Sequence, residues 1–235
     1  MIYVTSDLHG CPLEWLQDLL QKVGFSQEDD LFVLGDVIDR GDYGITLLRW
    51  MAEQPNVHLL LGNHEAMMLS CSFLFEEITE DSLAALDMDK MDIYRNWMEN
   101  GGEQTLAELK PLMKEQPDVL EGIWDLLRDA PLYETLELNG RRFLLVHAGL
   151  ENFRADRPLD DYAPGELLWA RPGPDVRYFD DMQTIFGHTP TALFGPQYRG
   201  RAVKTDTWIC IDTGVTAGYR PMLLRLDDMA EFYGA

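Results

Sequence analysis

Five short apolar segments of this chain each end in side chains that can bind a metal ion, and this pattern constrains the fold more than any other feature. Short apolar runs rich in Val, Ile, Leu and Phe are typical of buried β-strands. The carboxyl ends of parallel strands meet at one edge of a sheet, where ligands bind in open α/β folds. The sequence therefore predicts that the side chains after these strands gather in one site. The segments and the residues that follow them are Ile2–Thr5 with Asp7 and His9, Leu31–Leu34 with Asp36, Val57–Leu61 with Asn63 and His64, Phe143–Val146 with His147, and Thr184–Phe186 with His188.

The first three segments alternate with two amphipathic stretches. Cys11–Val23 places its leucines on one face, has Pro12 in the first turn and is followed by Gly24, so we expect a helix. A second helix is expected from about Tyr43 to Ala52. The resulting β-α-β-α-β order favours a parallel sheet covered by helices.

Strand signals disappear over 66–131, which is acidic, rich in methionine and favourable to helix. We interpret this segment as a helical insertion within one domain spanning 1–235, and its methionines and Trp97 as packing residues. Strands resume after it. Asn139 and Gly140 are the preferred two-residue turn of a β-hairpin, and Trp208–Ile211 and the last apolar run, PMLLRL, are further strand candidates. Residues 156–178, rich in Pro, Asp and Arg, are expected to be mostly loop.

The composition limits the partners and the compartment. The chain has 235 residues, of which 46% are hydrophobic, and a net charge of −22. This charge repels nucleic acids and anionic membranes, so neither is expected as a partner. The three cysteines form no CxxC pair, and the N-terminus lacks a signal-peptide pattern. We expect a cytoplasmic protein with buried, unpaired thiols.

The ligand types narrow the choice of metal. Four of the five histidines follow the predicted strands, whereas His58 lies inside one and is interpreted as structural. Imidazole combined with carboxylate and amide oxygen, without thiolate, suits Mn²⁺, Fe or Zn²⁺. The candidate ligands exceed what one tetrahedral ion needs and suit two ions that share a carboxylate. Two such ions can clamp a phosphate for in-line attack.

Five motifs together resemble the metallophosphoesterases, and more narrowly the phosphoprotein phosphatase family of serine/threonine phosphatases. Three further stretches, NWMENGG, LLWAR and IDTG, are similar to its bacterial and bacteriophage lambda-type branch. The sequence reads His-Ala-Gly where eukaryotic members have His-Gly-Gly, so no regulatory subunit is implied. The five motifs are DLHG at Asp7–Gly10, GDVIDRG at Gly35–Gly41, GNHE at Gly62–Glu65, VHAGL at Val146–Leu150 and FGHTP at Phe186–Pro190.

The resemblance implies a role for each site residue. His64 is the general acid, oriented by Asp39, and Arg40 and Arg171 grip the phosphate oxygens, although Arg177 in the same loop could replace Arg171. A hydroxide between the two metal ions would be the nucleophile. The implied ligands are Asp7 and His9 for the first ion, Asn63, His147 and His188 for the second, and Asp36 between them.

The same resemblance implies a layered α/β/β/α fold with two mixed sheets, the calcineurin-like metallophosphoesterase fold. It implies a manganese-dependent serine/threonine protein phosphatase, with a phosphoprotein as substrate and phosphotyrosine also accepted. The alternative is a symmetrical diadenosine tetraphosphatase of the same superfamily. Those enzymes tend to have Asp where this chain has Glu65 and to lack the Asp39-Arg40 pair, so the protein phosphatase is the expected function.

Overall fold

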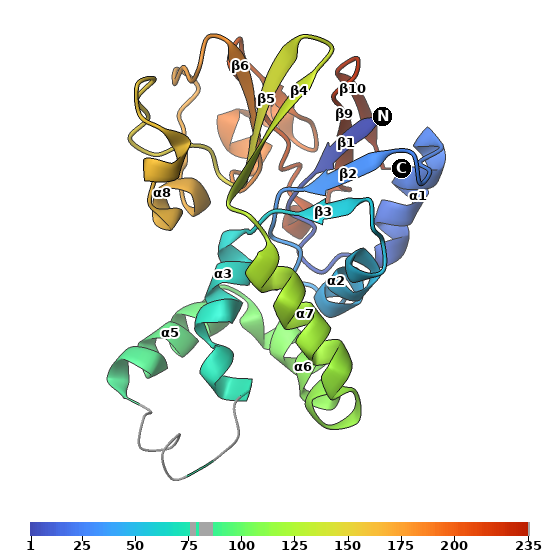
Figure 1. Cartoon of the computed structure of the whole chain (residues 1–235), viewed down its shortest axis with the longest axis vertical. Helices are drawn as coiled ribbons and strands as arrows, with labels where there is room; N and C mark the ends of the chain where they lie inside the picture. Colours follow the sequence, from blue (N-terminus) through green and yellow to red (C-terminus); the bar gives the residue numbers. More distant parts are fainter. Residues whose placement is uncertain (76–78, 80–86, 235) are drawn as a thin grey trace.

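The computed structural model describes residues 1–75, 79 and 87–234. Within these residues two five-stranded mixed sheets form, with strand orders β10-β9-β1-β2-β3 and β4-β5-β6-β8-β7 (Figure 1). The strands are β1 (Ile2–Thr5), β2 (Asp30–Val33), β3 (Val57–Leu59), β4 (Tyr133–Leu138), β5 (Arg141–Val146), β6 (Met182–Phe186), β7 (Val203–Lys204), β8 (Trp208–Cys210), β9 (Met222–Arg225) and β10 (Ala230–Tyr233).

Three apolar clusters show how the layers stack. One cluster joins Val4 and Leu224 of the first sheet to Phe143 and Ile185 of the second, so the two sheets pack face to face. A second cluster lies between the first sheet and the helices, and a third covers the outer face of the second sheet. The expected α/β/β/α architecture with two mixed sheets is therefore confirmed.

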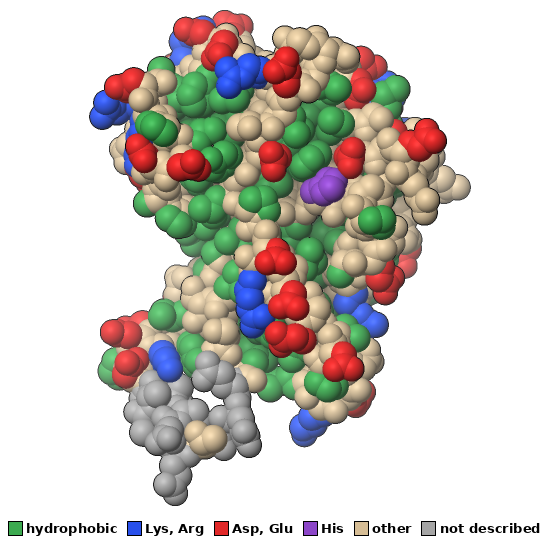
Figure 2. Space-filling view, in the orientation of Figure 1, with side chains coloured by type: hydrophobic (Ala, Val, Ile, Leu, Met, Phe, Trp, Pro, Cys, Tyr) green, Lys and Arg blue, Asp and Glu red, His purple; other side chains and the backbone are tan. Residues whose placement is uncertain are grey.

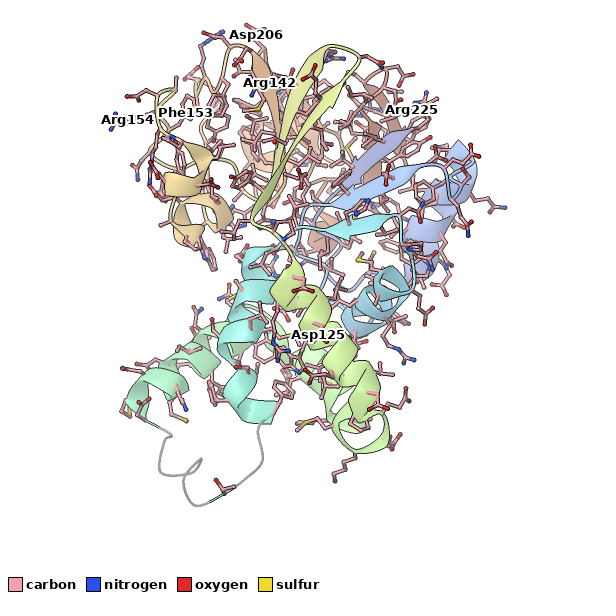
Figure 3. All side chains as sticks on the ribbon, viewed as in Figure 1. Asp125, Arg142, Phe153, Arg154, Asp206 and Arg225 are labelled. Atoms are coloured by element: carbon pink, nitrogen blue, oxygen red, sulfur yellow. The ribbon has the colours of Figure 1, made fainter. Side chains whose placement is uncertain are left out.

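The parallel strand pairs place the expected site. β1, β2 and β3 run parallel in the first sheet, and β5, β6 and β8 run parallel in the second. Their carboxyl ends lie toward α3 (Asn63–Ser70) (Figure 1). Arg142 and Arg225 lie at the opposite end of the sheets (Figure 3), where each pairs with an exposed aspartate. Exposed ion pairs of this kind contribute little stability.

The helices differ only slightly from the expected ones. α1 (Leu13–Val23) ends at Gly24, which adopts the left-handed conformation, and α2 is Gly44–Ala52. The short α8 (Pro164–Leu168) and the 3-10 turn Leu159–Asp161 lie in a segment that we expected to be mostly loop. The strands β7 and β10 were not expected, because both are short and interrupted by charged residues.

Between β3 and β4 the described residues form helices and no strand. These helices extend away from the two sheets, and acidic side chains are spread over the face seen in Figure 2. Residues 76–78 and 80–86 of the expected insertion lie outside the described residues. The elements after α3 are the 3-10 helix Ser72–Phe75, α5 (Met88–Glu99), α6 (Gly102–Glu115) and α7 (Pro117–Asp129).

Several smaller expectations are also met. Asn139 and Gly140 both have positive φ, as the hairpin turn requires. His58 binds Asp30 at 2.9 Å between its Nε2 and a carboxylate oxygen, which agrees with a structural role. The cysteines are free and buried. Among the described residues, no helix has both the length and the hydrophobicity needed to cross a bilayer.

Candidate metal centre and active site

The loops after the strands hold several predicted site residues in strained backbone conformations. In the described chain, nine residues other than glycine have positive φ, and six of these are predicted site residues. A left-handed conformation costs a non-glycine residue on the order of 1 kcal/mol, so it persists only where the surroundings enforce it. The concentration of such residues at one sheet edge marks a functional site. The six are Asp7, His9, Asp36, Asp39, Arg40 and His188.

Around His147, groups that carry lone pairs face one another. Its Nδ1 lies 2.7 Å from the carbonyl oxygen of Leu34, which can only accept, so Nδ1 holds the proton and Nε2 is unprotonated. Burial lowers the pKa of His147 to about 3, so the ring is neutral. Its Nε2 lies 2.9 Å from Oδ1 of Asn63 and 3.4 Å from Oδ1 of Asp36. Lone pairs that converge in this way fit a cation.

His188 completes this group. Its Nδ1 lies 3.2 Å from Nε2 of His147. Within the part of the chain that the structure describes, Nε2 of His188 is buried without a hydrogen-bond partner. The backbone N–H of His188 donates to both carboxylate oxygens of Asp7, at 3.0 Å each. Asp36, His147 and His188 lie close enough together to hold one metal ion.

A second group lies on the other side of Asp36. The Nδ1 of His9 faces the carbonyl oxygen of Ile38 at 3.1 Å, so its Nε2 is the unprotonated nitrogen, and this atom lies 3.6 Å from Oδ2 of Asp36. His9, Asp36 and His64 are also close enough together to hold an ion. Burial lowers the pKa of His9 and, reinforced by Asp7 and Glu65, raises the pKa of Asp36. Asp36 therefore lies between two groups, as a bridging ligand would.

The chemistry of these two groups shows whether divalent ions fit on either side of Asp36. Buried carboxylates are costly unless a positive charge compensates them. Burial and the nearby Asp212 raise the pKa of Asp7, which means that its ionised form lacks sufficient compensation from the protein. Neutral imidazoles, an amide oxygen and carboxylates without thiolate form a donor set that suits Mn²⁺, Fe or Zn²⁺. The residues present fit a pair of divalent ions.

His64 is held between the carboxylate of Asp39 and the guanidinium group of Arg40. Its Nδ1 lies 2.6 Å from Oδ2 of Asp39, and its Nε2 lies 2.9 Å from one terminal nitrogen of Arg40. The other terminal nitrogen of Arg40 lies 3.0 Å from Nε2 of His9. The guanidinium fork therefore faces the same space as the metal-binding groups. This places the expected acid, its orienting carboxylate and one expected phosphate-binding arginine together.

Two residues that the sequence analysis did not assign to the site hold Asp39. Trp97 of α5 donates from Nε1 to the Asp39 carboxylate at 3.0 and 3.2 Å, and the Thr105 hydroxyl of α6 donates to Oδ1 at 2.6 Å. The Thr105 hydroxyl also accepts from the backbone N–H of Asp39 at 2.9 Å. Trp97 is buried, as we expected, but it also serves the site. The NWMENGG motif contains Trp97 and was the sequence signal available for that residue, whereas Thr105 lies outside the motif.

Glu65 has a role that its motif did not reveal. Its buried carboxylate accepts from the backbone N–H groups of Asp36 and Val37 at 2.8 Å and from that of Gly62 at 3.1 Å. The side chain thus ties the start of α3 to the loop after β2. Glu65 shapes the backbone that presents Asp36, and it does not face the substrate space.

The site opens into a cavity of about 430 Å³. Arg171 lines this cavity and donates to the carbonyl oxygen of His188 at 3.3 Å. Arg177 instead forms exposed ion pairs with Asp180 and Asp206 away from the cavity, so the structure places Arg171 at the site. Asp212 also lines the cavity and accepts from the backbone N–H of Gly214.

A family model described as calcineurin-like phosphoesterase matches residues 1–217. The chain belongs to this family. As a calcineurin-like phosphoesterase it is a hydrolase, and the two groups around Asp36 are where the structure could hold metal ions. The broader of the two resemblances seen in the sequence, to the metallophosphoesterases, is therefore confirmed.

Several curated relatives of this phosphoesterase are named as bis(5'-nucleosyl)-tetraphosphatases. A symmetrical bis(5'-nucleosyl)-tetraphosphatase from Actinobacillus pleuropneumoniae serotype 3 (strain JL03) is 26% identical and spans 98% of this chain and 97% of its own length. One from Chromobacterium violaceum is 28% identical and spans 98% and 94%. An asymmetrical bis(5'-nucleosyl)-tetraphosphatase from Bacillus velezensis is 26% identical and spans 92% and 87%.

A solved structure shares the fold. It is provisionally described as a diadenosine tetraphosphatase, is 19% identical, and covers 100% of this chain and 93% of its own, with a TM-score of 0.64. Identity at this level supports the fold of the phosphoesterase and nothing finer.

The comparisons overturn the expected function. The protein phosphatase and its phosphoprotein substrate were the wrong choice, because relatives aligned over nearly the whole chain are tetraphosphatases. The criterion that misled was Glu65. Its carboxylate binds backbone N–H groups inside the protein, so its length does not report which substrate the phosphoesterase takes. The Asp39-Arg40 pair likewise contacts His64 and His9 beside the metal-binding groups, so it does not report which organic group the substrate carries.

Proposed function

We propose that this phosphoesterase cleaves dinucleoside tetraphosphates symmetrically, giving two nucleoside diphosphates. The proposal is supported most by the agreement between the chemistry of the site and the names of the relatives. Converging histidines and carboxylates, with Arg40 and Arg171 beside them, fit a polyphosphate chain, and relatives aligned over 98% of the chain are symmetrical tetraphosphatases. The other function considered, protein dephosphorylation, is not proposed.

The reaction adds water across the central phosphoanhydride. A new bond forms between the water oxygen and one inner phosphorus, and the bond from that phosphorus to the bridging oxygen breaks. Two bound divalent ions would supply Lewis acidity at the phosphoryl oxygens and activate the attacking water. We assign them to Asp7, His9, Asp36, Asn63, His147 and His188, with Mn²⁺ as the preferred metal.

The chain's own residues do the remaining work. The planar guanidinium groups of Arg40 and Arg171 bind phosphate oxygens through paired N–H groups, and this binding orients the chain for attack. His64 donates a proton to the leaving bridging oxygen, and Asp39 holds its ring in the required orientation. These four residues are the catalytic set that we propose.

Product analysis tests the proposal. The purified protein with Mn²⁺ is incubated with diadenosine tetraphosphate and, separately, with a phosphoserine peptide, and the products are separated by ion-exchange chromatography. We expect ADP as the nucleotide product and little phosphate released from the peptide. ATP with AMP would identify an asymmetrical cleavage, as in the name of the Bacillus velezensis relative, and would contradict the proposal. Asp36→Asn is the control, because it removes the carboxylate shared by both metal groups.

Three finer expectations stay predictions: the single domain over 1–235 with a helical insertion at about 66–131, the cytoplasmic location, and the placement near the bacteriophage lambda-type branch.

A further inference from the structure

Two grooves adjoin the central cavity, at different parts of its wall. The first, which we name the Trp169 groove, has a volume of about 430 Å³ and shares Asn63 and Trp169 with the cavity. The second, which we name the Tyr43 groove, has a volume of about 330 Å³ and shares His9, Arg40 and Thr216 with the cavity. The two grooves share no lining residue with each other among those described. Each groove is therefore continuous with the metal centre, and each leaves it at a different margin.

The Trp169 groove offers apolar surface and a few polar groups. Trp169 follows α8 directly, is 43% exposed, and packs in a T-shaped arrangement against His188 with ring centroids 5.8 Å apart. Ile93 of α5, 39% exposed, adds an aliphatic wall. Asn96 and Asp92 of the same helix supply an amide and a carboxylate. Aromatic and aliphatic surface with few polar groups is typical of small-molecule sites, and a carboxylate or amide can accept from an exocyclic amine.

The Tyr43 groove has a similar character. Tyr43 precedes α2 and is 47% exposed, and the ring of Trp15 and Pro12 also line the groove. No lysine lines either groove among the described residues, and Arg40 contributes to the Tyr43 groove where that groove meets the cavity. Among the described residues, the arginines that line these spaces are thus Arg40 and Arg171, at the centre, while each groove is lined by an exposed aromatic side chain, Trp169 or Tyr43. This distribution matches a ligand that is anionic in the middle and aromatic at both ends.

We propose that the Trp169 and Tyr43 grooves are the two nucleoside subsites, and that the dinucleoside tetraphosphate spans the metal centre with one base in each groove. The inference rests on the proposed function and extends it to named side chains. A simple phosphomonoester has one organic group and would leave one groove empty. Two grooves that leave the centre at different margins hold the central anhydride over the metals, which is the bond that symmetrical cleavage breaks.

The experiment compares diadenosine tetraphosphate with p-nitrophenyl phosphate in the manganese-loaded enzyme. Trp169→Ala and Tyr43→Ala remove one stacking surface each, and Trp169→Phe keeps an aromatic face. Alanine substitution of a residue that stacks on a base weakens binding by about 5- to 150-fold. We therefore expect each alanine variant to lower kcat/KM for the dinucleotide at least about 10-fold more than for p-nitrophenyl phosphate, mainly through KM.

A matched pair separates the groove from the helices around it. Ile93 lines the Trp169 groove and is 39% exposed, whereas Met113 on α6 lines neither groove and is 38% exposed. The two variants compared are Ile93→Ala and Met113→Ala. The selectivity for the dinucleotide should fall in Ile93→Ala and stay at the wild-type value in Met113→Ala. Trp169→Phe should retain most of it, which guards against a misfolded Trp169→Ala protein.

The outcomes distinguish the two proposals. If the wild-type enzyme hydrolyses p-nitrophenyl phosphate but not diadenosine tetraphosphate, the proposed function fails and the subsites fail with it. If the wild-type enzyme produces ADP but the groove variants lower both reactions equally, the subsite inference alone is overturned. Loss of selectivity at only one groove would overturn the placement of a base at both ends.

Discussion

At the scale of single residues, His64 is the side chain whose chemistry depends most on the substrate. Its Nδ1 is fixed by Asp39, which leaves Nε2, beside Arg40, as the nitrogen that would carry a proton to a leaving oxygen. An alkoxide leaves poorly without a proton, whereas p-nitrophenolate and a nucleoside diphosphate are far less basic and leave more easily. The importance of His64 should therefore follow the basicity of the leaving group.

We predict that His64→Asn lowers kcat for an alkyl phosphate by about 10²–10⁴, the usual contribution of a positioned acid. The loss should be much smaller for p-nitrophenyl phosphate and for diadenosine tetraphosphate. Steady-state kinetics on the three substrates measure it. Asp36→Asn is the comparison, because loss of the shared metal ligand should damage all three reactions together. Equal losses in His64→Asn would show that His64 acts in another way, for example as a metal ligand beside His9 and Asp36.

Thr105 is a positioning residue whose effect can be separated from packing. Its hydroxyl both donates to the Asp39 carboxylate and accepts from the Asp39 N–H. Thr105→Val keeps the shape but removes both bonds, so we expect kcat for the alkyl phosphate to fall at least about 10-fold through misalignment of the acid. The free energy of unfolding should fall by about 1–3 kcal/mol, because a buried N–H loses its acceptor.

Thr105→Ser is the matched control for that substitution. It keeps the hydroxyl and removes one methyl group, so kcat should return close to the wild-type value. Kinetics and urea unfolding of both variants provide the two readouts. A serine variant as impaired as the valine variant would show that packing, and not the hydroxyl, is what matters at this position.

The predicted site residues that the structure brings together share a local signal, and the residues that the sequence analysis missed do not. Asp7, His9 and Asp36 follow apolar strands directly, so strand ends alone bring them to one edge. Trp97 and Thr105 reach Asp39 from 58 and 66 residues away in the chain. Nothing local to an α-helix shows that its indole or hydroxyl will bind a carboxylate on a distant loop. Only the fold reveals such contacts.

At the scale of elements, the turn between α5 and α6 holds the loop that carries Arg40. The carbonyl oxygen of Gly101 accepts from the Arg40 N–H at 3.0 Å, and that of Asn100 accepts from Arg40 Nε at 3.4 Å. Gly101 has a φ of 99°, and a Cβ there would lie 2.7 Å from Arg40 Cγ. The helical segment therefore contributes directly to the catalytic loop.

We predict that Gly101→Ala lowers kcat/KM for diadenosine tetraphosphate at least about 10-fold, because it displaces the Arg40 fork by a fraction of an ångström to an ångström. Gly122, in the middle of α7, is the matched control: a Cβ there meets nothing within 4 Å. Gly122→Ala should leave the kinetics unchanged and stabilise the helix by about 0.5–1 kcal/mol. Steady-state kinetics and thermal unfolding of both variants test this prediction. Full activity in Gly101→Ala would refute the coupling between the α5–α6 turn and the position of Arg40.

Element prediction followed the strength of the periodic pattern. The helix Leu13–Val23 and the hairpin around Asn139 were predicted within a few residues, because their caps and turn residues are explicit in the sequence. The strand Val203–Lys204 has too few residues to show a period. The pairing of β9 beside β1 brings the end of the chain to its beginning, which no local pattern indicates. The second sheet came from the family resemblance alone.

At the scale of the whole molecule, the fold concentrates buried acids at the point where the two sheets meet. Asp7, Asp36, Glu65 and Asp212 are buried, and burial raises the pKa of each, that of Asp212 to about 6. A chain with a net charge of −22 adds no general compensation for them. The site therefore destabilises the protein unless cations bind. The fold is built to hold this arrangement, so metal binding and global stability should be linked.

We predict that Mn²⁺ raises the thermal midpoint and that a chelator lowers it. An ion that binds only the folded state at 100 times its Kd adds about 2.7 kcal/mol, which corresponds to a shift of about 5–10 °C for a chain of this size. Thermal unfolding with Mn²⁺ or with EDTA measures the shift. In Asp36→Asn, the shift should shrink to a small fraction, because both groups lose their shared ligand. Lys114→Gln on the distal end of α6 should keep the full shift. A thermal midpoint of the wild-type protein that does not change with Mn²⁺ would contradict the assignment of a metal centre.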